Sequence, residues 1–158
     1  VRDTMLLYLV RHGEAKPESE DPERGLTENG MKNARRVGEF LSFMGTELDA
    51  VIHSTKKRAR ETAQAITGSL RPKKEVREEA GLAPNDDPAA WVARINAMDE
   101  DTAIVGHLPF LDRLLGLLVL EDANRRVMDF KPAGAVCLKP AGGGRWLIEW
   151  AIGPGVIW

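Results

Sequence analysis

The feature that most constrains the fold is a run of apolar residues that ends abruptly in Arg-His-Gly. Residues 5–10 are all apolar, and Arg11, His12 and Gly13 follow at once. A continuous apolar run of this length is typical of a strand buried on both faces, as in a parallel sheet. Ligands of open α/β sheets bind beyond the carboxyl ends of such strands. The sequence therefore places a cation, an imidazole and a glycine where a ligand site is expected.

Two later segments also end in histidine after a predicted strand. Leu48 to His53 is predicted as a short strand, and Thr102 to Val105 as a buried strand followed by Gly106 and His107. Arg58 stands one turn into the helix expected after the first of these. Right-handed crossovers bring the carboxyl ends of parallel strands to one edge of a sheet. If the strands are adjacent, arginines, histidines and helix N-termini meet there, which predicts a pocket for a phosphoryl group.

Apolar residues at helical spacing predict helices between these strands. The expected helices cover residues 27–45, 54–68 and 88–98, with a fourth beginning at Pro109. Thr27 is expected to cap the first of them, and Ser54 or Thr55 the second. The buried face of the first helix is predicted to hold Met31, Ala34, Val37, Leu41 and Met44.

The last part of the chain predicts a β-hairpin. Its strands are expected at Ala135 to Leu138 and Arg145 to Ile152, joined across three glycines. Trp146, Ile148 and Trp150 are expected to alternate onto one buried face of the second strand. With the earlier alternation of strands and helices, this predicts an α/β fold: a three-layer α/β/α sandwich with a mostly parallel central sheet and a C-terminal antiparallel hairpin.

Length and composition narrow the class of protein further. A chain of 158 residues predicts one domain over residues 1–158. Its 22 basic and 24 acidic residues give a net charge of −2, which favours neither a nucleic-acid partner nor an anionic membrane. The single cysteine, Cys137, excludes an intramolecular disulfide and is expected to be inert. No apolar stretch is long enough to span a bilayer, so we expect a cytoplasmic protein.

Four ordered segments carry a resemblance to a known family. They are Leu9-Val10-Arg11-His12-Gly13-Glu14, Leu26-Thr27-Glu28-Asn29-Gly30, Ser54-Thr55-Lys56-Lys57-Arg58-Ala59-Arg60-Glu61-Thr62-Ala63 and Val105-Gly106-His107. Their order and spacing resemble those of the histidine phosphatase superfamily, the phosphoglycerate mutase-like proteins. The short chain and the sequence Gly106-His107-Leu108-Pro109 are most similar to the SixA-type phosphohistidine phosphatases.

The resemblance implies a catalytic role for four residues. His12 would be the nucleophile that becomes phosphorylated, Arg11 and Arg58 would hold the phosphoryl oxygens, and His107 would stabilise charge in the transition state. Elementary chemistry agrees, because an imidazole can be neutral and nucleophilic at neutral pH. Guanidinium groups also make planar, bidentate contacts with phosphoryl oxygens.

Three further residues are candidates for phosphate binding. Gly13 leaves room for an anion next to the backbone, and the helix after Leu108 offers free backbone N–H groups. Ser54 could contact phosphate or only cap a helix. We expect no metal and no cofactor, because a phosphoenzyme route needs neither and no cluster of ligands at metal-binding spacing is present.

The proton donor is the least defined part of the predicted site. Members of the family that cleave alkyl phosphates carry an acid after the second helix, where this chain has Glu78 and Glu79 without a surrounding motif. A departing imidazole needs less help than an alkoxide. The weak acid signature therefore favours a phosphohistidine substrate.

The leading hypothesis is a metal-independent phosphatase that acts through a phosphohistidine intermediate, with a phosphohistidine-bearing protein as partner. The chain has little room for lid insertions, so an open site is expected. The alternatives are a small-molecule phosphomonoesterase and a non-catalytic phosphate-binding domain.

Several other residues near the motifs are expected to have ordinary roles. His53 is predicted to be structural, although it also stands at a strand end. Glu14 could lie at the pocket rim or in a plain loop. Lys56, Lys57 and Arg60 are expected on the surface, where a basic rim could meet an acidic protein partner.

Overall fold

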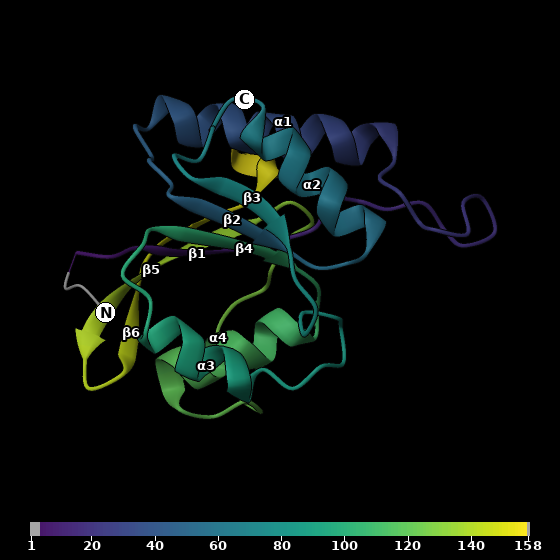
Figure 1. The fold of residues 1–158 in the computed structure, drawn as a ribbon. Coiled ribbons are helices and arrows are strands. Elements are labelled where there is room, and N and C mark those ends of the chain that lie inside the picture. The colour runs from purple at the N-terminus through teal and green to yellow at the C-terminus, as the bar shows by residue number, and fades with distance from the viewer. Residues whose placement is uncertain (1–3, 158) are drawn as a thin grey trace.

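The computed structural model describes residues 4–157, and within them six strands form one mixed sheet. The strand order is β3-β2-β4-β1-β5-β6 (Figure 1). The strands are β1 (Leu7–Arg11), β2 (Ala50–His53), β3 (Glu75–Glu78), β4 (Thr102–Gly106), β5 (Ala135–Gly142) and β6 (Arg145–Ile152). The continuous apolar sequences of β1 and β4 are explained by their place in the middle of this sheet, where both faces are covered.

Four neighbouring strands run parallel, and their register aligns their carboxyl ends. Arg11 of β1 pairs with Gly106 of β4, and His53 of β2 pairs with Val105 of β4. The two strands at the other edge, β5 and β6, are antiparallel to their neighbours. The mostly parallel sheet with an antiparallel C-terminal pair is therefore confirmed.

Helices cover both faces of the sheet (Figure 1). The pair α1 (Glu28–Phe43) and α2 (Lys57–Thr67) lies on one face, and the pair α3 (Ala89–Asn96) and α4 (Phe110–Leu120) on the other. A short 3₁₀ helix, η1 (Pro154–Val156), contacts α1. The predicted three-layer arrangement is thus confirmed. Within residues 4–157, none of the helices combines the length and the apolar character that crossing a bilayer requires.

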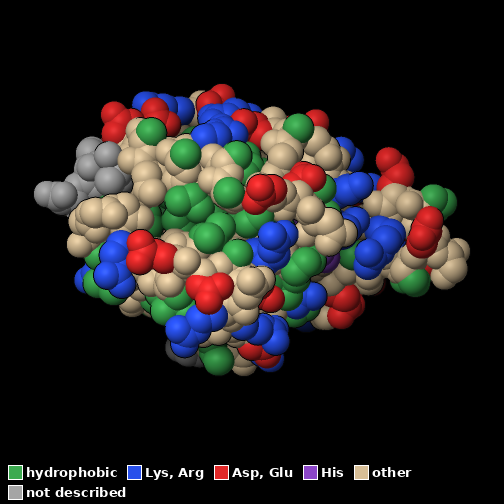
Figure 2. Space-filling model, turned by 90° about the horizontal axis from the view of Figure 1, so that it is seen from below, with side chains coloured by type: hydrophobic (Ala, Val, Ile, Leu, Met, Phe, Trp, Pro, Cys, Tyr) green, Lys and Arg blue, Asp and Glu red, His purple; other side chains and the backbone are tan. Residues whose placement is uncertain are grey.

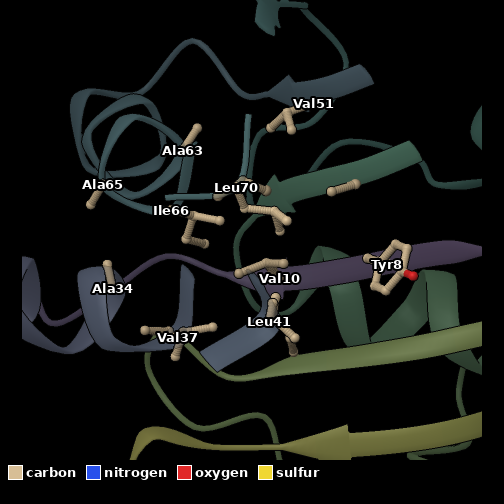
Figure 3. Packing of buried hydrophobic residues seen from close by; sticks show 14 of the residues in the cluster. Tyr8, Val10, Ala34, Val37, Leu41, Val51, Ala63, Ala65, Ile66 and Leu70 are labelled. Carbon is tan, nitrogen blue, oxygen red and sulfur yellow. The ribbon is translucent and has the colours of Figure 1, made fainter. Parts of the chain in front are cut away.

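The sheet separates two hydrophobic cores. Figure 3 shows the first, in which side chains of α1 and α2 such as Val37, Leu41 and Ile66 meet Tyr8 and Val10 of β1. The second lies under α3 and α4 and is built around large buried residues; these include Phe110, Leu111, Leu114, Phe130 and Trp146. Burying one large apolar side chain contributes about 1.5–3 kcal/mol to the stability of the fold. The two cores therefore hold the helices firmly against both faces of the sheet.

Glycines bring α1 unusually close to its neighbours. A Cβ added at Gly30 would overlap the carbonyl oxygen of Glu14, and one at Gly38 would lie 2.5 Å from the carbonyl oxygen of Ile66. A Cβ at Gly13 would in turn lie 2.9 Å from the carbonyl oxygen of Gly30. Backbone-to-backbone packing therefore fixes the segment after β1 against the start of α1.

The helix boundaries agree with the sequence in part. Thr27 caps α1 as predicted, because its Oγ1 accepts a hydrogen bond from the Gly30 N–H at 2.9 Å. The expected burial of Met44 is wrong: its side chain is 48% exposed. The α2 helix begins at Lys57 with Lys56 as N-cap, later than predicted. Pro109 is likewise the N-cap of α4 rather than its first residue.

The predicted single-faced stripe on β6 is wrong. Cys137 pairs with Trp150 whereas the next residue of β5 pairs with Ile148, so β6 has an extra residue at this point. This irregularity turns the side chains before and after it to opposite faces. Trp146 is buried under α3 and α4, whereas Trp150 packs on the other core with its ring centroid 6.0 Å from that of Tyr8. Strand β5 also extends to Gly142, beyond its predicted end.

Candidate active site

The backbone of His12 is fastened to the carboxyl end of β4 and to the loop before β5. The His12 N–H donates to the Gly106 carbonyl at 2.9 Å, and the His12 carbonyl accepts from the Ala133 N–H at 3.2 Å. The next N–H, that of Gly13, donates to Oγ1 of Thr62 in α2 at 2.9 Å. The apolar run of β1 therefore ends with its histidine held between two strands and a helix.

The ring of His12 has one defined orientation. Its Nδ1 lies 2.7 Å from the carbonyl oxygen of Gly13, and because a carbonyl only accepts, Nδ1 carries the proton. Burial lowers the pKa of His12 to about 4, and the charges of Arg58 and Arg11 act in the same direction. The ring is therefore neutral at pH 7, with the lone pair on Nε2. A neutral imidazole of this tautomer can attack an electrophilic phosphorus atom.

A second histidine, His107, lies beside the first. It follows β4, is 1% exposed, and its ring centroid lies 5.1 Å from that of His12. Burial, together with the nearby His12 and Arg58, lowers the pKa of His107 to about 3. His107 is therefore neutral at pH 7 as well.

Ser54 contacts His107 directly. The Oγ atom of Ser54 lies 2.6 Å from Nε2 of His107 and accepts a hydrogen bond from the Lys56 N–H at 3.2 Å. With that bond accepted, the hydroxyl proton is free to point at Nε2. This arrangement fits a neutral ring with its proton on Nδ1.

Three buried donor groups of the site have no partner within residues 4–157: Nδ1 of His107 and the Nε atoms of Arg11 and Arg58. Buried polar groups are nearly always hydrogen-bonded, so each such atom calls for an explanation. Cationic and ring N–H donors are the groups that bind the oxygens of an oxyanion. The site therefore has the donors that a tetrahedral oxyanion requires.

Two arginines frame the histidines. Arg11 donates from Nη1 to the Phe130 carbonyl at 2.8 Å, which fixes its guanidinium at the end of β1. Arg58 lies in the first turn of α2, where burial and the charge of Arg24 lower its pKa. The Arg58 carbonyl accepts from Oγ1 of Thr62 at 2.7 Å, so one threonine links this turn to Gly13.

A third arginine, Arg24, was not singled out by the sequence. It belongs to the loop between β1 and α1, has a positive φ of 51°, and donates from Nε to the Lys16 carbonyl at 3.1 Å. Its charge contributes to lowering the pKa of His12, Arg58 and His107. No motif surrounds it, because it stands in a polar loop rich in acidic residues.

The two candidate acids lie at the carboxyl end of β3, the edge strand that pairs with β2. Glu78 is exposed. Glu79 accepts from Nε of Arg77 at 3.0 Å and from Nη2 of Arg94 at 2.9 Å. These contacts hold the pKa of Glu79 below its usual range, so Glu79 is ionised at neutral pH and is poorly suited to donate a proton.

A different carboxyl group has the opposite character. Asp112, in the first turn of α4, has a buried Oδ1 with no partner among the described residues, and Nε of Arg126 lies 3.5 Å from its other oxygen. Burial raises the pKa of Asp112. No sequence motif singles out Asp112, because an acidic residue in the first turn of a helix is ordinary.

The remaining predicted residues lie around this centre. Gly13 is buried, and Leu108 is half-buried between His107 and Pro109. His53 is buried, and its Nδ1 lies 2.9 Å from the carbonyl oxygen of Ser54. We assign it neither of the roles considered for His12 and His107. Glu14 accepts from Oγ1 of Thr27 at 2.7 Å, which ties the loop to the start of α1. In Figure 2, seen from the side of α3 and α4, only a small area of histidine is visible, with lysine and arginine side chains beside it.

The fold and the site together define an α/β protein with paired histidines and arginines at the carboxyl end of a mostly parallel sheet. Residues 7–84 match the family model of the histidine phosphatase superfamily, branch 1. The chain belongs to this superfamily.

Part of the chain is similar to curated proteins. The serine/threonine-protein phosphatase Pgam5 of Drosophila ananassae, a mitochondrial protein, is 36% identical over 105 residues, which are 61% of this chain and 36% of the relative. The chain thus spans about a third of the length of this relative.

Two solved structures share the fold over almost the whole chain. A structure of the protein histidine phosphatase SixA with tungstate has a TM-score of 0.86 at 22% identity and covers 96% of this chain and 98% of that chain. A protein described as the phosphohistidine phosphatase SixA of Agrobacterium tumefaciens has a TM-score of 0.78 at 24% identity, covering 96% and 99%.

Proposed function

We propose that this protein is a metal-independent phosphatase that removes the phosphoryl group from phosphohistidine in a protein through a phosphorylated His12 intermediate. The observation that carries the proposal is the state of His12. Its Nδ1 proton is engaged by the Gly13 carbonyl, its pKa is about 4, and its ring lies 5.1 Å from that of His107. A neutral, oriented nucleophile beside unpaired donors is what phosphoryl transfer to a side chain needs.

The reaction would proceed in two displacements. Nε2 of His12 attacks phosphorus, and the P–N bond of the substrate breaks with its electron pair going to the substrate imidazole, which leaves as a neutral ring when it is protonated before cleavage. Water then attacks phosphorus, and the bond to Nε2 breaks with its electron pair returning to His12. Inorganic phosphate departs, and one proton of the water is released to solvent, which balances the proton taken up by the leaving imidazole. Arg11, Arg58 and Nδ1–H of His107 would hold the phosphoryl oxygens in both steps.

The surroundings of the candidate acids favour a P–N bond over an ester. Glu79 is ionised between Arg77 and Arg94, and Glu78 is exposed. An alkoxide leaving group needs a well-placed acid, whereas a protonated imidazole does not. A fold relative, the protein histidine phosphatase SixA, was solved in complex with tungstate, an oxyanion, and this supports an oxyanion ligand for the present chain.

A phosphomonoester is the second candidate substrate class. Pgam5 is described as a serine/threonine-protein phosphatase, and Asp112 offers a partly buried carboxyl group with a raised pKa near the start of α4. A preference for esters would direct attention to Asp112, Glu78 and Glu79 as acids.

The test is a comparison of substrates without added metal and with a chelator present. We expect a phosphohistidine-bearing protein to be hydrolysed faster than a phosphoserine peptide or p-nitrophenyl phosphate. His12→Ala should lower turnover by at least about 10³-fold while the protein stays folded, because the covalent route is lost.

The same experiment separates the alternatives. Radiolabelled phosphate should be trapped on the unaltered protein, but not on His12→Ala, after denaturation in alkali. Phosphate binding without turnover and without a trapped label would instead support a non-catalytic phosphate-binding domain. Near-normal rates of His12→Ala would show that the nucleophile is another residue.

A further inference from the structure

A groove rich in cations borders the candidate active site. It has a volume of about 410 Å³ and lies between the loop that joins β1 to α1 and the start of α2. Five of its side chains are cationic: Arg24, Lys56, Lys57, Arg58 and Arg60. Two carboxylates, Glu18 and Glu23, also line it. We call this feature the basic groove. Because Arg58 belongs to both, the groove is continuous with the phosphoryl-binding centre.

The loop on one side of the basic groove is held in place by hydrogen bonds and an ion pair. Asp21 accepts from the Gly25 N–H at 2.9 Å and from the Glu23 N–H at 3.0 Å, and it lies 3.3 Å from Nζ of Lys57. The Leu26 N–H donates to the Glu61 carboxylate in α2 at 2.8 Å. The loop, which extends from the body at the right of Figure 1, is thus tied to α2 at two points.

Most of the positive charge in the basic groove is not neutralised by the protein itself. In the described part of the chain, Lys57 forms salt bridges with Asp21 and Glu23, but Arg24, Lys56, Arg58 and Arg60 form none with a carboxylate. The chain as a whole carries a net charge of −2, so this excess is local. Gathering like charges costs electrostatic free energy, which a bound anionic partner would offset.

We infer that the basic groove binds acidic side chains that flank the phosphohistidine on the substrate protein; this inference rests on the proposed function. The phosphoryl group would occupy the centre between His12 and His107, while neighbouring carboxylates of the substrate meet Lys56, Arg60 and Arg24. Discrete carboxylates fit better than a nucleic acid. A continuous phosphodiester chain would run against Glu18 and Glu23, which also line the groove.

The test uses two charge-reversed variants of the full chain with the same change in net charge. Lys56→Glu with Arg60→Glu alters the basic groove and leaves the proposed catalytic residues in place. Lys139→Glu with Arg145→Glu alters exposed residues of the β5–β6 hairpin and is the matched control. Substrates are two phosphohistidine peptides, one flanked by Asp and Glu and the other by Asn and Gln, and free phosphohistidine.

We expect the groove variant to raise KM for the acidic peptide about tenfold more than it raises KM for the neutral peptide and for free phosphohistidine, with kcat little changed. Raising the salt concentration should raise KM for the acidic peptide on the unaltered protein and should do so less on the groove variant. The hairpin variant should behave as the unaltered protein.

Two kinds of failure can be told apart. If the unaltered protein does not hydrolyse free phosphohistidine, the proposed function is wrong, and with it the substrate named here. If free phosphohistidine is hydrolysed but KM for the acidic peptide is the same for both variants, the groove inference alone is wrong. Competition by a single-stranded oligonucleotide that the groove variant abolishes, with no difference between the peptides, would assign the basic groove to nucleic acid instead.

Discussion

Along the carboxyl ends of the parallel strands, two neighbouring regions differ in whether their charged side chains form ion pairs within the protein. Where β1, β2 and β4 end, Arg11 and Arg58 lie beside half-buried His12 and buried His107 and form no salt bridge with a carboxylate among the described residues. Where β3 ends, Glu79 lies between Arg77 and Arg94 at ion-pair distance. Charge that the protein compensates itself serves structure, whereas charge left without a partner is free to bind a ligand.

The largest effect is expected from removing an uncompensated charge. Arg58→Ala should lower kcat about 10²- to 10³-fold, because one of the fixed donors for the phosphoryl oxygens is lost. Binding of vanadate or phosphate, measured by calorimetry, should weaken as well. Arg94→Ala, which removes a compensated charge, is the control and should retain most activity. Unchanged oxyanion binding by Arg58→Ala would move Arg58 out of the site.

The two histidines with lowered pKa values, His12 and His107, should make the protein sensitive to acid. Both pKa values are lowered in the folded state, to about 4 for His12 and about 3 for His107, from the ordinary 6.5. Between pH 6.5 and 4 the unfolded chain binds protons that the folded chain does not, so acidification favours unfolding. Each histidine then adds a slope of about 1.4 kcal/mol per pH unit.

Urea denaturation at pH 7, 6 and 5 checks this, because carboxylates contribute little in that range. Stability should fall on acidification and stay level above pH 7. His107→Gln should reduce the slope, and an equal slope for this variant would contradict the assignment to His107.

A smaller effect is expected from the contact that orients His107. Ser54→Ala removes the partner of Nε2 at 2.6 Å and should lower kcat about tenfold, the value of one buried hydrogen bond. Ser54→Thr keeps the hydroxyl group and should recover much of the loss. The two variants are compared by steady-state kinetics across pH 5–8. If the Ala variant matches the unaltered protein at every pH, Ser54 only caps the turn before α2.

The smallest effect is expected at Glu79, whose charge is compensated by two arginines. Glu79→Gln should change turnover of phosphohistidine by less than about threefold and the free energy of unfolding by about 1 kcal/mol or less, as for other surface ion pairs. Steady-state kinetics and thermal denaturation measure the two quantities. A large loss of activity, with stability unchanged, would restore Glu79 as the proton donor.

The sequence predicts which side chains follow the central strands, because the signals for those strands are local. The apolar runs before His12 and His107 predicted central parallel strands, and parallel strands bring their ends together regardless of side-chain detail. The start of α1 could likewise be predicted, because Thr27 belongs to a capping pattern of a few consecutive residues.

What escaped prediction depends on packing between distant segments. Arg24 reaches the site through a loop whose shape is set by contacts with α2, and Asp112 owes its raised pKa to burial. The opposite faces of Trp146 and Trp150 follow from one extra residue in the pairing of β5 with β6. None of these contacts leaves a periodic or local trace in the sequence.

The close backbone packing of α1 has a consequence for attempts to engineer a more heat-resistant form. Replacing a helical glycine with alanine commonly stabilises a protein by about 0.4–1 kcal/mol, and α1 offers Gly30 and Gly38. Both are closed to this strategy, because the methyl group would strike the carbonyl of Glu14 or Ile66. Gly68, at the end of α2, has helical backbone angles, and a methyl group there would meet its nearest atom at 3.5 Å. The glycines of α1 would be the usual positions for such a replacement, but the close packing of α1 against its neighbours, including the loop after His12, rules it out.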